Sequence, residues 1–183
     1  MRKTIILILT LLLSSCSSQP RTSLQSLKGV DHNNKEIEIK TNKSKATIIV
    51  FLSAFCPCSK SHLPLLSKMQ EDNKDIQFIG IHSNYNEDHA KAKSYFSKSK
   101  LNFPVIHDKD SSLAKRIGGL KTPHAFIVDN AGTIIYKGSV TNSSNASKAK
   151  ENYLLQAINE LNNGKAISTP VRKVLGCNII TKN

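Results

Sequence analysis

The sequence predicts a single α/β domain built around a mixed β-sheet. Two continuous apolar runs, residues 46–52 and 76–82, are rich in β-branched side chains, as strands buried on both faces of a sheet are. Segments with helical spacing alternate with these runs, and two further strand-like segments, 124–129 and 133–138, are joined by a short turn. A chain of 183 residues has the length for one core rather than two.

Residues 1–15 have the pattern of a secretory signal peptide. Arg2 and Lys3 precede an apolar run at residues 4–13, which is too short to span a bilayer as a permanent helix. The run ends in Leu-Ser-Ser-Cys, which resembles the lipobox of bacterial lipoproteins, so we expect Cys16 to carry a lipid anchor. The alternative is an ordinary signal peptide with an incidental cysteine. With the lipid anchor, we expect the protein in the bacterial cell envelope, facing the periplasm or the exterior.

This interpretation divides the chain into four parts. The signal peptide is followed by a polar tether at 16–26, a folded domain at 27–163 and a tail at 164–183 that carries Cys177. The lipid at Cys16 would hold the domain close to the membrane.

The charge pattern argues against nucleic acid as a partner. The net charge is +13, and it falls to +11 once Arg2 and Lys3 are removed. The lysines are scattered singly, and aromatic residues make up only 5% of the chain, whereas single-stranded nucleic acids are bound by basic grooves that also carry stacking rings. We therefore expect a solvated basic surface that favours anionic lipid headgroups near the anchor.

The predicted elements of the first half lead to the cysteines. Residues 36–40 alternate as a half-buried strand does, and the strand at 46–52 runs directly into Cys56. A helix beginning near Pro57 then places Leu63, Leu66 and Met69 on one face, with Pro64 inside it as an expected kink.

The second half continues the alternation. After the strand at 76–82, we predict a helix at 87–99, a short strand at 104–106 and a helix at 111–117 that ends at Gly118. The hairpin of 124–129 and 133–138 follows, and a final helix is predicted at 149–161.

The cysteine count suggests redox chemistry. Without Cys16, the chain keeps Cys56, Cys58 and Cys177, an odd number for an oxidising compartment, so one thiol is free or the disulfides exchange. Cys56 and Cys58 flank Pro57 where a strand meets a helix, and a helix N terminus stabilises the reactive thiolate. Because Cys56 precedes the helix, we expect it to be the more exposed of the two and predict it as the nucleophile.

Over roughly residues 23–163 the chain resembles the thioredoxin superfamily, and within it the exported TlpA/ResA-like and AhpC/TSA-type redoxins. The resemblance rests on four segments in order: ATIIVFLSAF before Cys56, IQFIGIHSNYNED at 76–88, LNFPVIHDKDSSLAKRIGG at 101–119, and KTPHAFIVDNAGTIIYKG at 121–138. It implies a thioredoxin-like fold, a central mixed sheet flanked by helices, with an inserted βα unit between the active-site helix and a cis proline.

The cis proline of the family falls on Pro123, and the resemblance implies that Thr122 and Pro123 bind substrate beside the active-site cysteine. The residues agree in kind, because a proline that begins the strand at 124–129 cannot donate to a ladder and should lie at a strand end. There, an open backbone edge could receive a substrate chain.

Several family positions differ in this chain. The second cysteine of the family's Cys-x-x-Cys motif would fall on Ser59, the buried acid of thioredoxins on Val50, and the glutamate of many TlpA/ResA-like proteins on His62. His62 and His124 are therefore candidates for proton handling, and a histidine without a role is the alternative at both positions.

Two thiols are candidates to resolve an intermediate on Cys56. A disulfide to Cys58 would close a small ring with unfavourable geometry. Cys177 lies in the tail, whose Gly-Cys-x-Ile sequence resembles the end of some redoxin-type relatives, although a buried thiol that only docks the tail is equally compatible.

The leading hypothesis is a membrane-anchored thiol–disulfide oxidoreductase in which the Cys56 thiolate attacks disulfides and Cys58 or Cys177 resolves. We expect a monomer that acts on protein or small-molecule thiols and disulfides, with no cofactor and no metal. One alternative is a thiol peroxidase, whose motif would fall on Ile49, Ser53 and Cys56. The other is a Cu(I)-binding chaperone of the same fold.

Overall fold

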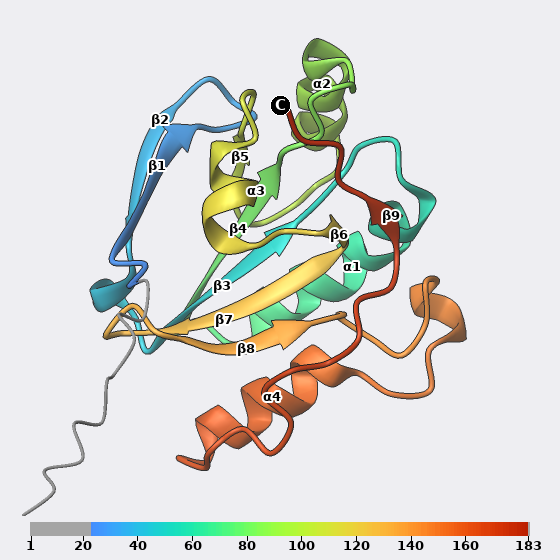
Figure 1. The fold of residues 1–183 in the computed structure, drawn as a ribbon. Coiled ribbons are helices and arrows are strands. Elements are labelled where there is room, and N and C mark those ends of the chain that lie inside the picture. The colour runs from blue at the N-terminus through green and yellow to red at the C-terminus, as the bar shows by residue number, and fades with distance from the viewer. Residues whose placement is uncertain (1–22, 183) are drawn as a thin grey trace, which may run out of the picture.

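The computed structural model describes residues 23–182. The predicted signal peptide, Cys16 and most of the predicted tether lie outside these residues. A five-stranded mixed sheet forms the centre of the fold (Figure 1), in the order β5-β4-β3-β7-β8. Its strands are β3 (Ala46–Phe51), β4 (Ile76–His82), β5 (Val105–His107), β7 (His124–Asp129) and β8 (Ile134–Gly138). The first three are parallel, β7 runs antiparallel to β3, and β8 runs antiparallel to β7.

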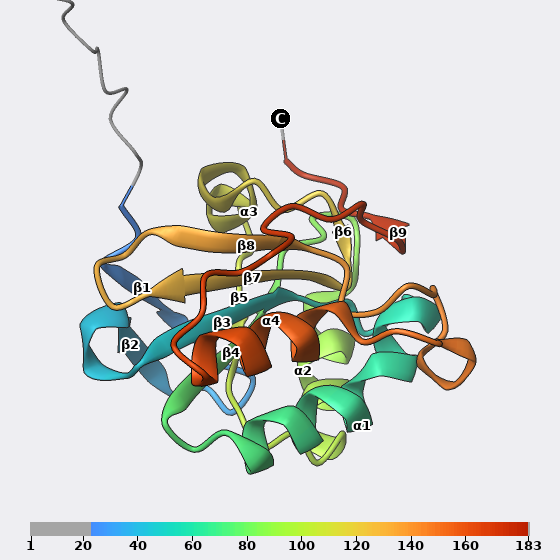
Figure 2. The ribbon, with the colours of Figure 1, turned by 90° about the horizontal axis from the view of Figure 1, so that it is seen from below.

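The two faces of the sheet are covered differently, as Figure 2 shows. One face carries the three long helices, α1 (Pro57–Asp72), α2 (His89–Lys98) and α4 (Tyr153–Asn162). The other carries α3 (Ser112–Ile117) and a separate hairpin of β1 (Ser26–Val30) and β2 (Glu36–Lys40).

Strand β3 explains this layering, because its side chains alternate between two cores. Ile48 and Val50 pack with Leu66 under the long helices, whereas Ile49 and Phe51 pack with Leu27 under the hairpin. All six residues of β3 are buried, as its unbroken apolar run predicted.

The predicted insertion is present. Helix α2 and strand β5 lie between β4 and α3, and β5 forms the edge of the sheet next to β4. The Thr122–Pro123 peptide bond is cis, which confirms the prediction made from the resemblance.

Most boundaries agree with the sequence prediction to within two residues, and two differ by more. The fold begins before residue 27, since Leu24 is buried and its N–H bonds to the Gly132 carbonyl. Helix α4 begins four residues later than predicted, because the side chain of Asn142 accepts the N–H groups of Lys150 and Glu151 and holds them out of a helix. Short 3₁₀ turns occur at Thr41–Lys43 and Ala146–Lys148.

The tail returns to the centre of the molecule after α4. It crosses the end of β8, and β9 (Cys177–Asn178) then pairs antiparallel with β6 (Lys121–Thr122) directly before the cis proline (Figure 1). Within residues 23–182, no helix is both long and apolar enough to cross a membrane.

Candidate active site

Cys56 lies where β3 gives way to α1, as the sequence predicted. It is the N-cap residue of α1, Pro57 occupies the first turn, and Cys58 follows inside the helix. The hydroxyl of Ser53 accepts the N–H groups of Phe55 and Cys56, both at 3.0 Å. These bonds fix the loop and leave the Cys56 side chain directed toward the cis proline.

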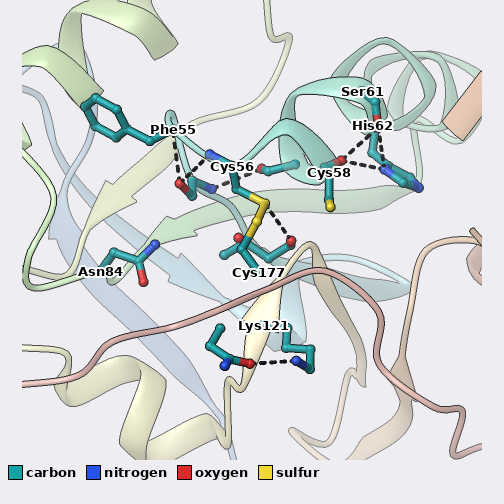
Figure 3. Close-up of a disulfide and its surroundings, with 12 residues drawn as sticks. Phe55, Cys56, Cys58, Ser61, His62, Asn84, Lys121 and Cys177 are labelled. Carbon is teal, nitrogen blue, oxygen red and sulfur yellow. Dashed lines mark hydrogen bonds between the residues drawn. A yellow bond between two sulfur atoms is a disulfide. The ribbon is translucent and has the colours of Figure 1, made fainter. Parts of the chain in front are cut away.

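Cys56 forms a disulfide with Cys177 across 121 residues of sequence (Figure 3). Cys56 is only 3% exposed, whereas Cys58 is half-buried and carries a free thiol. The expectation that Cys56 is the more exposed cysteine was therefore wrong. It followed from the start of the helix alone and did not take into account that the tail, through Cys177, covers Cys56.

The tail occupies the backbone edge next to Pro123. Thr122 and Cys177 are register partners in the β6–β9 pair, and the Cys56 sulfur lies 3.2 Å from the Thr122 carbonyl oxygen. Gly176 has φ +132°, and a Cβ atom there would lie 2.2 Å from the same oxygen. Only glycine allows this approach of the two backbones.

Further contacts hold the tail after Cys177. The backbone of Ile180 bonds to Asn84 and Tyr85, and the N–H of Ile179 bonds to the Leu120 carbonyl. The Lys121 ammonium donates to the Asn178 side chain (Figure 3). The tail is thus an ordered part of the site.

The sulfur atoms of Cys56, Cys58 and Cys177 all lie within 4.8 Å of one another. Both thiols that the sequence suggested as partners of Cys56 therefore stand beside it. Ser59, at the family's second cysteine position, is fully buried, and its hydroxyl accepts the N–H of Ser53. It supports the loop and faces away from solvent.

His62 is buried and bonded through both ring nitrogens, so it is not a solvent-facing side chain. Its Nδ1 lies 2.7 Å from the Cys58 carbonyl oxygen and its Nε2 2.9 Å from the Thr141 hydroxyl. Burial lowers the pKa of His62, against a smaller opposing effect of the Cys58 carbonyl. The His62 ring is therefore neutral and connects α1 to the loop that carries Thr141.

His124 packs on Phe126, with ring centroids 4.3 Å apart, and its Nδ1 accepts the N–H of Leu120. Burial, aided by the charge of Lys137, lowers the pKa of His124 to about 4. The ring is therefore neutral at pH 7 and shapes the segment before the cis proline.

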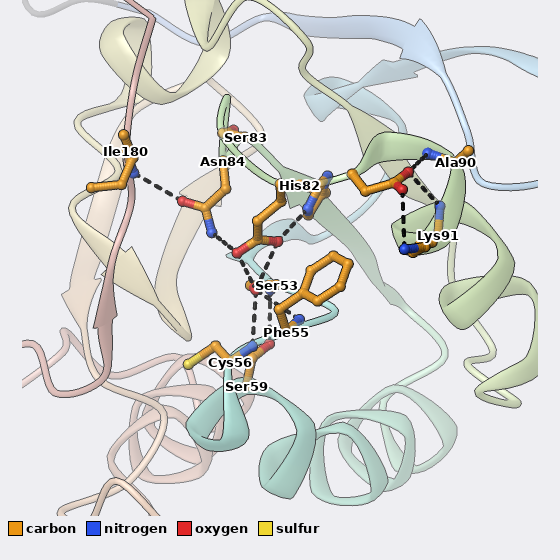
Figure 4. A network of polar contacts seen from close by, with 12 residues as sticks. Ser53, Phe55, Cys56, Ser59, His82, Ser83, Asn84, Ala90, Lys91 and Ile180 are labelled. Atoms are coloured by element: carbon orange, nitrogen blue, oxygen red, sulfur yellow. Dashed lines mark hydrogen bonds and ion pairs between the residues drawn. The ribbon is translucent and has the colours of Figure 1, made fainter.

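Glu87, which we did not predict from the sequence, connects to the Cys56 loop through Ser53, and Figure 4 labels its partners Ser53, His82 and Asn84. The Ser53 hydroxyl donates to the Glu87 carboxylate at 2.7 Å, and His82 Nε2 and the Asn84 amide also bond to it. Burial raises the pKa of Glu87, but the hydrogen bonds from His82, Ser53 and Asn84 outweigh it, so the pKa lies below its usual value. Val50, at the position of the buried acid of thioredoxins, is packed in the apolar core. Among residues 23–182, Glu87 is the only acid that is hydrogen-bonded to the Cys56 loop.

One signal in the sequence could have led to Glu87. The segment at 83–88 follows β4, and the carboxyl ends of parallel neighbours lie at the same edge of a sheet. An acid just after β4 is therefore a neighbour of a cysteine just after β3.

Comparisons with known proteins show which proteins the chain resembles. The chain is 23% identical over 117 residues to the thiol-disulfide oxidoreductase ResA of Bacillus subtilis, covering 62% of this chain and 64% of ResA. The chain thus spans under two thirds of that curated relative.

Solved structures share the fold. An uncharacterised conserved protein from Geobacillus kaustophilus superposes with a TM-score of 0.78 at 23% identity, covering 88% of this chain and 91% of that one. The thioredoxin domain of a thiol-disulfide oxidoreductase from Bacteroides vulgatus gives a TM-score of 0.54 at 19% identity, covering 66% and 89%. The fold is therefore thioredoxin-like, as expected. The Redoxin family model matches residues 17–154, so the chain belongs to the redoxin family.

Proposed function

We propose that this protein is a thiol–disulfide oxidoreductase in which Cys56 is the nucleophile and Cys177 the resolving thiol. The observation that carries the proposal is the disulfide of Cys56 and Cys177 at the start of α1, beside the cis proline. The helix N terminus stabilises the thiolate that forms when this disulfide is reduced.

The reaction follows from thiol–disulfide exchange. The Cys56 thiolate attacks one sulfur of a substrate disulfide, which releases the first substrate thiolate and leaves a mixed disulfide on Cys56. The Cys177 thiolate then attacks the Cys56 sulfur and releases the second substrate thiolate. The substrate gains two electrons, the protein becomes the Cys56–Cys177 disulfide, and a dithiol donor restores the reduced form. Reversal of the same steps oxidises a substrate dithiol.

The tail supports this assignment of Cys177. It forms a strand along the Thr122 edge, which is where we expected a substrate chain to pair. A substrate strand and the tail would compete for one edge, so formation of the mixed disulfide requires the tail to leave and resolution requires it to return. Cys58, the half-buried third thiol, is the alternative resolving residue.

Three single variants test the proposal with a fluorescent glutathione disulfide as substrate. Cys56→Ser should abolish turnover. Cys177→Ser should accumulate a mixed disulfide on Cys56, visible as a mass increase of one substrate thiol. Cys58→Ser should keep turnover. Retained turnover in Cys56→Ser would overturn the proposal, and trapping by Cys58→Ser instead of Cys177→Ser would transfer the resolving role to Cys58.

The peroxidase alternative has less support from the site. The Ser53 hydroxyl donates to Glu87 and accepts from the loop backbone, so its hydrogen bonds are made away from the Cys56 sulfur. Sub-stoichiometric hydrogen peroxide should therefore oxidise Cys56 slowly.

The Cu(I) alternative is favoured by one observation, the three sulfur atoms within 4.8 Å of one another. Thiolates are the ligands that Cu(I) prefers. Titration of the fully reduced protein against a Cu(I) chelator separates the two functions. A protein that is only an oxidoreductase should leave the Cu(I) bound to the chelator.

We further propose that the protein acts in the cell envelope, anchored by a lipid on Cys16. The support is the signal pattern at residues 1–16 and the disulfide, which is typical of oxidising compartments. Cys16→Ser should abolish incorporation of labelled palmitate and release the protein from the membrane fraction. Unchanged labelling would contradict the anchor.

A further inference from the structure

A cluster of three histidines lies at the same sheet edge as the cysteines, outside the disulfide site. His82 ends β4 and His107 ends β5, and they are register partners in this parallel pair. His89 is the first residue of α2, and its ring lies beside that of His82. The ring centroids of His82 lie 5.3 Å from His89 and 5.5 Å from His107. One nitrogen of each ring lies within 4.8 Å of those of the other two.

The hydrogen bonds of these rings are incomplete. His82 has no exposed side-chain surface, its Nε2 bonds to Glu87 at 2.8 Å, and its Nδ1 is buried without a partner. Both ring nitrogens of His107 and the Nδ1 of His89 are also buried without a partner. A buried polar atom is normally hydrogen-bonded, because leaving it unpaired costs free energy. Three neighbouring rings with free buried nitrogens point to a missing ligand.

We propose that His82, His89 and His107 bind one divalent transition-metal ion of the Zn²⁺, Co²⁺ or Cu²⁺ class. Three imidazole nitrogens with an open fourth position are a common ligand set for such ions. A metal-bound histidine usually donates its other N–H to a carboxylate, which fixes the tautomer. Glu87 stands in this relation to His82, so that the His82 Nδ1 lone pair is left for the ion.

The rings need little movement to meet one ion. Nitrogens bound at ~2.1 Å in tetrahedral geometry lie roughly 3.4 Å apart, and the three nitrogens here lie within 4.8 Å of one another, so they must approach by no more than roughly 1.4 Å. His89 and His107 are only half-buried, and both border a surface cavity of about 720 Å³ through which an ion can enter.

The charged residues around the histidines favour a transition-metal ion over Ca²⁺ or Mg²⁺. Lys93 and Lys109 line the cavity together with Asp110. Two lysines beside one carboxylate disfavour Ca²⁺ and Mg²⁺, which need several oxygen ligands.

The test uses protein without an affinity tag, oxidised to the Cys56–Cys177 disulfide and carrying Cys16→Ser and Cys58→Ser, so that no thiol can bind metal. Titration with Co²⁺, followed by visible absorption, and with Zn²⁺, followed by calorimetry, should give one site per chain. His89→Ala and His107→Phe should each weaken binding at least about 10-fold, the latter with its ring packing kept. Glu87→Gln should weaken binding about 10-fold or more, as loss of a carboxylate partner does.

His62→Gln is the matched control, because His62 is a buried histidine beside the cysteines instead of in the cluster. It should bind Co²⁺ as the parent does. Absence of a stoichiometric site in the parent would overturn the proposal, and so would a site that survives both His89→Ala and His107→Phe. The experiment measures no disulfide exchange, so its outcome is independent of the proposed function.

Discussion

Thr122 and Cys177 are register partners in a two-residue antiparallel pair, which places the tail on the backbone edge directly before the cis proline. This pairing brings Cys177 to Cys56 and at the same time covers Cys56. The state with the disulfide is thus a closed state, and access to Cys56 depends on release of the tail.

Gly176→Ala should prevent this closure. The new Cβ would lie 2.2 Å from the Thr122 carbonyl oxygen, at a φ of +132° that alanine rarely adopts. In a glutathione redox buffer that keeps half of the wild-type protein in the Cys56–Cys177 form, the variant should keep under about a tenth, because a loss of ~1.4 kcal/mol is a tenfold change. Quantitative alkylation of free thiols measures the disulfide fraction of the wild type and of the variant.

Gly164→Ala is the control for that change. Gly164 also has a positive φ, +66°, but a Cβ there meets nothing within 4 Å. Its cost should fall on overall stability and leave the disulfide fraction unchanged. Equal disulfide loss in both variants would show that backbone strain in general, and not the contact with Thr122, is responsible.

Reduction should lower the free energy of unfolding substantially. The Cys56–Cys177 bond spans 121 residues, and chain-entropy arguments assign such a loop roughly 4 to 5 kcal/mol. Urea unfolding with and without reductant measures the difference, which Cys58→Ser should leave unchanged. An unchanged midpoint on reduction would contradict the disulfide.

Glu87→Gln should destabilise the oxidised protein by about 2 kcal/mol at pH 7, because the carboxylate accepts charged hydrogen bonds from buried groups. The pKa of Glu87 is lowered in the folded state, so its contribution is present above about pH 4.5 and is lost as the pH falls through the folded pKa. The gap between wild type and variant should therefore narrow in acid. The exposed Glu71→Gln is the control, and an equal effect there would contradict a role for the network.

Protonation of His124 should destabilise the fold in mild acid. Its pKa is lowered from 6.5 to about 4, so the unfolded chain takes up the proton first as the pH falls. Stability should decrease between pH 6.5 and pH 4, by up to about 3 kcal/mol from this ring. His124→Phe should remove part of this decrease in the free energy of unfolding, measured by urea unfolding at several pH values. A variant with the wild-type slope would show that other groups carry it.

The sequence predicted the sheet and the long helices because these elements depend on local apolar periodicity. The strand at 46–51, the helix from Pro57 and the hairpin of β7 and β8 all lie where that periodicity placed them. The β1 strand was missed because five residues with a glycine give too short a pattern. The late start of α4 depends on the Asn142 side chain, which no helix pattern reveals.

The candidate site was predicted only in part, since its burial depends on contacts between distant segments. Cys56, Cys177 and the cis bond at Pro123 follow from sequence and resemblance. The burial of Cys56 and the closeness of Glu87 to its loop do not, because both require the tail and the β4 end to be placed in space first.

The most direct measurement of the central claim is mass spectrometry of the oxidised protein after blocking free thiols with an alkylating reagent. Trypsin cleavage after lysine and arginine should release residues 46–60, with Cys56 and Cys58, and residues 174–182, with Cys177. We expect these two peptides to be joined by a disulfide and the alkyl group to be on Cys58. A disulfide within residues 46–60, with Cys177 alkylated, would contradict it.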